Sequence, residues 1–331
     1  MANEKKSGCF KIGCFGCLGL GAVVILIFVL LSLVQLARES RGREMVTRNA
    51  SRELPRIEAL ERMIARGEIG EAGSLRIDPE LLADPAIASR IGRIQLDLAY
   101  GEFEIVAGEP GSEVEVEADF EEGAYRFEER LVETEDGGYT YTVTMRPRGG
   151  MVGLMLRGAG SNPGNSVTIR LPPDRPLDLV GTLGLGSSVL DLGGLWLRRV
   201  DLDGGTGEHT ITFDRPLRSP LELFAVRKSI GELTVESLGN ASPAVVELEQ
   251  SVGEITVDLG GAWVTDSELR ISNRIGEVSI RAPDRARLEI DSASIGIGER
   301  VIRSPSGEGL PDDAPTLRLL VRGQVGEINV R

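Results

Sequence analysis

Residues 246–257 read VELEQSVGEITV, and residues 269–280 read LRISNRIGEVSI. In both stretches apolar residues alternate with polar ones up to a Gly-Glu pair and resume out of step after it. Alternation of this kind predicts a β-strand on each side of the pair. The step across the pair, from Val252 to Ile255, is three residues instead of two. We therefore expect a corner or bulge, where glycine is favoured, that keeps both apolar rows pointing inward.

The Gly-Glu pair recurs along the chain. The copies are Gly101-Glu102, Gly207-Glu208, Gly231-Glu232, Gly253-Glu254, Gly276-Glu277 and Gly326-Glu327, with weaker copies at Gly186 and Gly296. Such recurrence is typical of stacked repeats, whose rungs lie about 4.8 Å apart and share one apolar interior. The predicted fold class is an all-β, repeat-built, β-solenoid-like domain, in which these pairs are structural corners.

A polar or small residue occupies the third position before five of the corner glycines. The position holds Gly204, Lys228, Gln250, Asn273 and Gly323. We expect it to lie close to the corner, where a small or hydrogen-bonding side chain fits better than leucine.

Composition bounds the class of protein. The chain has 331 residues, of which 41% are hydrophobic and 27% charged, as in folded proteins. Its 37 basic and 51 acidic residues give a net charge of −14. A basic patch for gripping phosphates is lacking, so nucleic acid is not expected as a partner.

The segment 12–37 contains no charged residue and is long enough to span a bilayer as a helix. It follows a short basic tail, residues 1–11. A cleaved signal peptide is the alternative, but the apolar stretch is too long and lacks a small-x-small cleavage site. Cys9 precedes the segment, and Cys14 and Cys17 open it. The three cysteines could be acylated or could share a metal ion. We favour a third interpretation, in which they are only small residues at the entrance of the helix.

Charge around the span leaves the orientation open, because basic residues stand on both sides of it. Counting alone favours a cytoplasmic C-terminal side, yet a long C-terminal domain often translocates regardless of flanking charge. We predict a single-pass protein in the cytoplasmic membrane of a bacterium, with the β domain outside the cytoplasm.

Residues 38–90 are predicted to form a helical stalk beside the membrane. Ser51 suits a helix N-cap, Pro55 a first turn and Gly67 the helix end, and Asp84 precedes Pro85 as a second capping residue.

Residues 91–331 are predicted to be the β-repeat domain. It divides into N-terminal strands and a hairpin (91–148), a Gly-rich loop (149–164) and the Gly-Glu repeats (165–331).

Residues for catalysis are scarce, since the chain has one histidine and no cysteine after Cys17. We predict no enzyme activity, no catalytic residue, no cofactor and no metal site. His209 occupies an inward slot and is expected to pack near an end or edge of the stack. The segment 204–209 resembles a calcium-binding nonapeptide, but His209 replaces the aspartate that would bind the ion.

The corner glutamates are expected to align in a column along the stack, through Glu208, Glu232, Glu254 and Glu277. Two carboxylates about 4.8 Å apart repel by roughly 0.9 kcal/mol in water, before screening. A solvated column tolerates this repulsion. We favour that interpretation over a bound divalent cation.

The Gly-Glu series, with Gly193-Gly194-Leu195 and residues 259–263 closing repeat units, resembles the toast-rack superfamily of bacterial envelope proteins over residues 93–331. The superfamily includes LiaF-like stress proteins and adhesin-type domains. The resemblance implies a non-enzymatic, membrane-tied β domain that senses, scaffolds or adheres, with a protein partner in the membrane or envelope and self-association left open. The unit around Gly296 departs from the pattern, since Gly298 and Arg300 stand where apolar residues belong.

Three functions therefore remain open. They are an envelope sensor or scaffold, which we favour, a surface adhesin, and a hydrolase built around the loop 149–164.

Overall fold

The computed structural model describes residues 44–67, 81–82, 84–149, 164–303 and 309–331. Met45–Arg331 forms one compact unit, the β domain. The predicted basic tail (1–11) and membrane span (12–37) lie outside the described residues, as does nearly all of the predicted loop 149–164. Within the described ranges, no helix is both long and apolar enough to cross a membrane.

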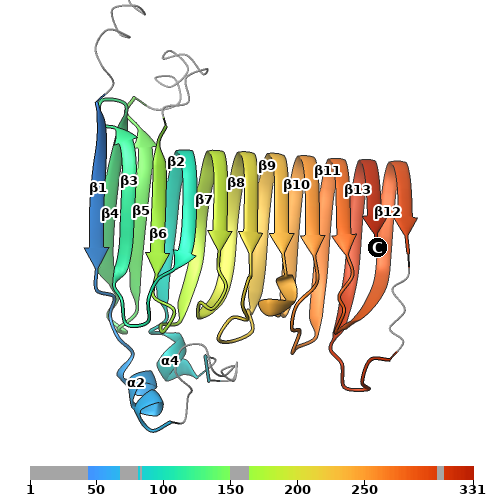
Figure 1. Cartoon of the computed structure of the whole chain (residues 1–331), viewed down its shortest axis with the longest axis horizontal. Coiled ribbons are helices and arrows are strands. Elements are labelled where there is room, and N and C mark those ends of the chain that lie inside the picture. Colours follow the sequence, from blue (N-terminus) through green and yellow to red (C-terminus); the bar gives the residue numbers. More distant parts are fainter. Residues whose placement is uncertain (1–43, 68–80, 83, 150–163, 304–308) are drawn as a thin grey trace, which may run out of the picture. The chain divides into compact units, whose positions relative to one another are not determined.

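The β domain is built from strands that lie side by side in one row, which confirms the all-β prediction (Figure 1). The strands are β1 (Met45–Arg52), β2 (Gly92–Ala107), β3 (Val114–Glu121), β4 (Tyr125–Glu133), β5 (Tyr139–Pro147), β6 (Ser166–Leu171), β7 (Leu177–Asp191), β8 (Leu197–Thr212), β9 (Leu223–Glu236), β10 (Val245–Asp258), β11 (Ser267–Arg281), β12 (Arg287–Ile302) and β13 (Thr316–Val330). The described helices are α2 (Glu58–Ala65), α4 (Pro85–Ala88) and the 3₁₀ helix η1 (Leu238–Asn240).

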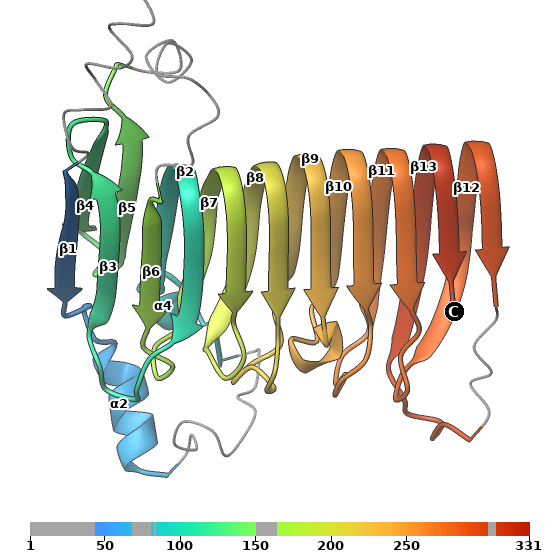
Figure 2. The same ribbon diagram turned by 45° about the horizontal axis from the view of Figure 1, so that its top comes forward.

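The long strands form a parallel stack in the order β2, β7, β8, β9, β10, β11, β13, β12. Each of them bends over along one long edge of the stack, so its two halves lie in facing layers (Figure 2). One long strand with its loop is therefore one rung. The corners are in register: Gly231 pairs with both Gly207 and Gly253, and Gly276 pairs with both Gly253 and Gly326. The predicted stack of corners is confirmed, including Gly101 opposite Gly186 at its start.

Two features of the corner require glycine. The backbone at Gly253 has φ of +127°, a region that residues with a side chain rarely adopt. In addition, a Cβ atom placed on Gly253 would lie 1.9 Å from the carbonyl oxygen of Gly231 in the previous rung. A Cβ atom placed on Gly276 would lie at the same distance from the carbonyl oxygen of Gly253. Backbones therefore approach so closely at the corner that no side chain fits between the rungs.

The apolar rows on the two sides of each corner fill one continuous core. In β10, Val246, Leu248, Ile255 and Val257 are all fully buried. Equivalent residues of neighbouring rungs stack on them, so a single core runs through the whole row of strands. No rung could bury these side chains alone, which is why repetition is a condition for the fold.

Antiparallel strands close the N-terminal end of the stack. β1 pairs with β3 and β3 with β6, and β6 continues to β2. The predicted hairpin is confirmed as β4 paired with β5. The predicted helical stalk over 38–90 is wrong for residues 45–52, which form β1 instead. Ser51 is in that strand and donates a hydrogen bond to Glu113, so it does not cap a helix.

The remaining part of the predicted stalk contains two short helices. α2 begins at Glu58 without a side-chain cap, and Pro55 precedes it instead of forming its first turn. α4 follows Asp84 as predicted.

At the C-terminal end the strands are out of chain order, because β13 lies between β11 and β12. The corner of β12 is Gly298-Glu299, which pairs with Gly326-Glu327, and the predicted corner at Gly296 is wrong. Arg300 of β12 stands opposite Ile328, which is fully buried in β13. A rung with arginine in an inward slot belongs at the end of the stack, where the guanidinium reaches water. β13, whose buried side chains are all apolar, belongs inside.

We predict that Gly253→Ala destabilises the β domain strongly, because the methyl group meets the Gly231 oxygen and the backbone has positive φ. The loss should exceed about 3 kcal/mol, which is more than backbone strain alone costs. Thermal unfolding followed by circular dichroism measures it.

Two further glycines separate the causes. Gly111 has φ of +78° with open space around it, and Gly123 has open space without positive φ. Gly111→Ala should cost about 1–2 kcal/mol and Gly123→Ala close to none. Equal losses at Gly253 and Gly111 would contradict the close-approach argument.

Candidate binding surface

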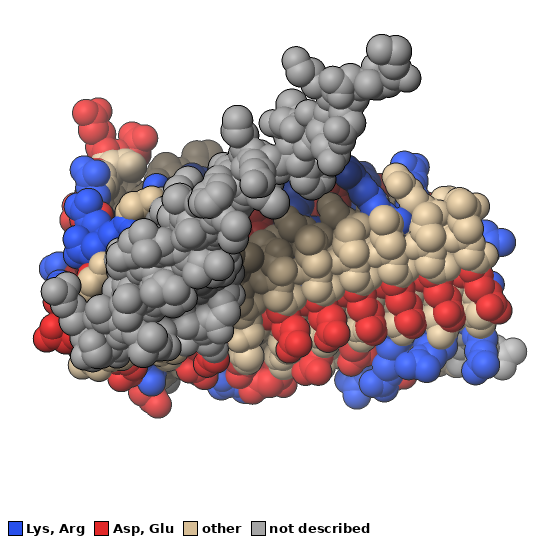
Figure 3. Space-filling model, turned by 90° about the horizontal axis from the view of Figure 1, so that it is seen from above, with Lys and Arg blue, Asp and Glu red and all other residues tan. Residues whose placement is uncertain are grey.

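The corner glutamates form one continuous column. Glu208, Glu232, Glu254, Glu277, Glu327 and Glu299 are neighbours in register. Their side chains are exposed or half-buried, and Figure 3 shows acidic side chains as a straight row along the stack. The predicted column is thus confirmed and extended by two residues. Glu102 does not join it, because Ser187 stands opposite Glu102 in β7 and interrupts the row.

A second row, of exposed apolar side chains, runs beside the glutamates. Each member directly precedes a corner glycine and is in register with the member in the next rung. The members are Ile230, Val252, Ile275, Val325 and Ile297. Their exposed fractions range from 39% at Val252 to 71% at Ile297. The sequence-based prediction that Val252 points inward is therefore wrong. We call the apolar row and the glutamate column together the corner ridge.

The inward position near the corner is taken by polar side chains instead. Gln250 donates from Nε2 to the carbonyl oxygens of Gly231 (2.6 Å) and Val252 (3.1 Å). Asn273 donates from Nδ2 to those of Gly253 (2.8 Å) and Glu277 (3.1 Å). These bonds satisfy carbonyl groups that the bend removes from the regular pattern, as buried backbone groups require. The predicted placement of the polar slot is confirmed.

Lys228 occupies the same slot in β9, in register with Gln250. The residue is 4% exposed, and its Nζ atom has no hydrogen-bond partner among the described residues. Burial lowers the pKa of Lys228 to about 8, against the raising effect of Glu208 and Glu232. A lysine in this slot is costly, because its charged form lacks the bonds that the amides of Gln250 and Asn273 make.

His209 is buried in the middle of the stack, and its expected place near an end or edge is wrong. Its Nδ1 atom is hydrogen-bonded to Ser188 Oγ at 2.6 Å, and both residues are at most 3% exposed. The ring lies against Gly204, which leaves space for it. Burial lowers the pKa of His209 to about 4, and the charge of Lys228 acts in the same direction. The Ser-His pair is enclosed in the core, so no substrate reaches it.

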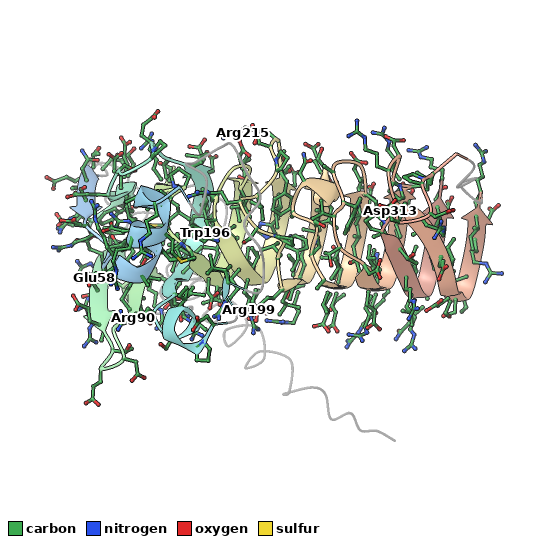
Figure 4. The ribbon with its side chains drawn as sticks, turned by 90° about the horizontal axis from the view of Figure 1, so that it is seen from below. Glu58, Arg90, Trp196, Arg199, Arg215 and Asp313 are labelled. Atoms are coloured by element: carbon green, nitrogen blue, oxygen red, sulfur yellow. The ribbon has the colours of Figure 1, made fainter. Side chains whose placement is uncertain are left out.

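A separate apolar cluster lies under α2. It contains Trp196, Leu60 and Ile87, and Arg218 stacks on the Trp196 ring at 4.8 Å. Beside it is a cavity of about 300 Å³ lined by residues that include Ile57, Leu60 and Tyr139. Figure 4 shows Glu58, Arg90 and Trp196 toward the end of the domain that carries α2, far from Asp313. Sequence periodicity does not reveal this cavity, because its walls come from four separate segments.

Metal-binding geometry is absent from the described ranges. No group of three or more His, Cys, Asp or Glu side chains in that part of the chain is placed to hold a metal ion. The corner ridge offers one carboxylate per rung.

Residues 76–236 match the family model described as the N-terminal domain of toast_rack, DUF2154. These residues belong to the toast-rack family. The resemblance inferred from the Gly-Glu corners is confirmed. Past residue 236 the toast-rack stack continues with the same corner geometry, since Gly253 and Gly276 repeat the positive φ and the close approach seen at Gly231.

The similarity to solved structures is low in both sequence identity and TM-score. A candidate cell adhesion protein from Clostridium sporogenes ATCC 15579 is 12% identical, with 87% of this chain and 99% of that chain covered and a TM-score of 0.38. A candidate adhesin (BF0245) from Bacteroides fragilis NCTC 9343 is 10% identical, with 88% and 98% covered and a TM-score of 0.33. No curated protein sequence matches the chain. At these scores neither structure bears on function.

We predict that Lys228→Gln stabilises the toast-rack stack by about 1–3 kcal/mol at pH 7. Glutamine can copy Gln250 and donate to the carbonyl oxygens of Gly207 and Ile230. The reciprocal change, Gln250→Lys, should destabilise. Chemical denaturation measures both free energies of unfolding.

The pH dependence gives a second readout. Because the folded pKa of Lys228 is below the unfolded value, the unfolded chain binds more protons between about pH 8 and 10.5, and stability rises with pH there. Lys228 is the only lysine after Lys11, so no other lysine of the β domain contributes. The rise between pH 8 and 9.5 should vanish in Lys228→Gln, and a flat wild-type profile would refute the assignment.

Proposed function

We propose that this chain is a non-enzymatic, membrane-anchored binding or scaffolding protein of the bacterial cell envelope, and that the corner ridge is its contact surface. The observation that carries the proposal is the in-register row of five exposed apolar side chains beside six glutamates. Contiguous exposed apolar rows with a polar border mark interaction sites on soluble domains. The toast-rack match supports the same class of protein.

The ridge defines the chemistry of its partner. A protein surface with an apolar row beside lysine or arginine residues complements it, since the six carboxylates share one sign. The repeat also favours a β-sheet surface over a helix, because the rungs recur every ~4.8 Å whereas a helical turn advances ~5.4 Å. Over the length of the ridge a helix would drift out of step.

We propose a protein without enzyme activity because of where its reactive side chains lie. The Ser188-His209 pair is sealed in the core, and the glutamates of the ridge are solvated and equivalent from rung to rung. Catalysis needs groups with different roles converging on one site, and a uniform column provides no such difference.

Anchoring rests on the sequence. The uncharged segment 12–37 is suited to span a bilayer, and we propose that it holds the chain in the cytoplasmic membrane with the β domain outside the cytoplasm. A membrane anchor confines the ridge near its partner and raises their effective concentration.

We predict that a photo-crosslinking amino acid at Val252 captures a partner protein in intact cells, and that capture weakens with salt because the glutamate column is screened. Val264 is the matched control, since it is a similarly exposed valine in the loop after β10. Capture should also be lost when Ile230 and Ile275 are both changed to Ser. Equal capture from Val252 and Val264 would overturn the assignment of the ridge.

We predict that deletion of residues 12–37 moves the chain from the membrane fraction to the soluble fraction of a bacterial host. A reporter fused after Arg331 should be active only outside the cytoplasm in the intact chain. The variant with Cys9, Cys14 and Cys17 all changed to Ser should remain in the membrane, because the span and not acylation is the anchor. Release of that variant, or a reporter active only inside, contradicts the proposal.

A further inference from the structure

The stack ends in an open strand edge at β12. Along Arg287–Ile302 this strand pairs with β13 on one side, and no other described strand pairs with its second side. Figure 1 shows β12 as the last rung. An edge strand of this length presents a row of unpaired backbone donors and acceptors, which is a template for another strand.

The core is also uncovered at this end. Leu288 and Ile290 are half-buried, whereas Leu317 and Leu319, their partners in β13, are fully buried. Antiparallel strands close the opposite end of the stack, but the described residues hold no equivalent closure beyond β12. Stacked-repeat proteins need their terminal rungs covered or made polar.

The charges of β12 are balanced but unevenly placed. The half of β12 before the corner, its acidic limb, has a net charge of −1 from Arg287, Glu289 and Asp291. The half after the corner together with Arg303, its basic limb, has a net charge of +1 from Glu299, Arg300 and Arg303. Within the chain, Glu289 lies 4.0 Å from Arg318, and Arg300 donates a hydrogen bond to the carbonyl oxygen of Ala293.

A two-fold axis through the corner matches this pattern. Rotation about it places the acidic limb of one copy beside the basic limb of the other, and does so twice. The strands then run antiparallel, and inward side chains meet inward side chains. Ile297, the most exposed apolar residue of the ridge, would lie next to its own counterpart at such an axis.

We propose that β12 pairs with β12 of a second copy of this chain, joining two stacks end to end into one continuous core. The inference stands on the geometry of β12 and is independent of the proposed function. A head-to-tail contact is disfavoured, because the other end of the stack exposes two edge strands, β1 and β4, that would meet limbs of like charge. β1 carries Arg48 and Arg52 and continues the layer of the limbs after the corner, which are basic in β12. β4 carries two arginines and three glutamates and continues the layer of the limbs before the corner, which are acidic in β12.

The test uses the full chain in detergent, with Cys9, Cys14 and Cys17 changed to Ser and one new cysteine added. Ile297→Cys should form a covalent dimer on mild oxidation, because the two thiols meet at the axis. Ile275→Cys is the matched control: it lies on the same ridge, two rungs inside the stack, and should stay monomeric.

Light scattering without crosslinking gives the second measurement. The chain should form dimers at micromolar concentration. Arg303→Glu should weaken them at least ten-fold, and adding Asp291→Arg should restore them, because with Ile297 at the axis Arg303 of one copy lies opposite Asp291 of the other. Circular dichroism confirms that each variant is folded. A chain that stays monomeric at 100 µM, a ladder of larger oligomers, or equal crosslinking from Ile275→Cys would each overturn the proposal.

Discussion

The close approach of backbones at the corner is the constraint on which the structure depends. Each corner glycine lies against the carbonyl oxygen of the glycine one rung earlier, with 1.7 to 1.9 Å left for a Cβ atom from Gly186 to Gly326. A side chain at one corner would separate two rungs and open the shared core. Because the rungs are hydrogen-bonded in series, the same residue is required at every level. The repeat in the sequence is therefore a direct consequence of backbone geometry.

The bend also determines what surrounds it. A chain that turns sharply removes carbonyl groups from the regular pattern, so the residue facing them inside must donate a hydrogen bond, as Gln250 and Asn273 do. The next apolar residue is then forced to the outside, where Val252 and Ile275 are exposed. An exposed apolar row beside a glutamate column thus arises from one local geometry repeated. Lys228 departs from this geometry, because its buried ammonium group lacks the hydrogen bonds that the amides of Gln250 and Asn273 make.

The sequence predicted most of this fold, because alternation and a repeated glycine report burial and positive φ residue by residue. The sequence-based prediction was wrong where the same residue type fits two different placements. Val252 fits an inward row and an outward ridge equally well, and only the hydrogen bonds of Gln250 decide between them. The segment 45–52 failed for a different reason: β1 pairs with β3, about 70 residues away, and local cues such as Ser51 carry no information about such a partner. The cavity under α2 is likewise assembled from distant segments.

The ends of the stack are stabilised differently from its middle. An interior rung is stabilised on both sides by copies of itself, whereas an end rung must tolerate water on one side. At the N-terminal end, short antiparallel strands with buried aromatic residues, among them Phe120 and Tyr125, close the core. At the other end the chain places β12 outside β13, although β13 comes later in sequence. Arg300 explains this exchange, because an arginine in an inward slot is tolerable only where the guanidinium reaches solvent or an opposing carboxylate. The last rung is thus distinguished from the others by charge, and charge is what can specify its neighbour.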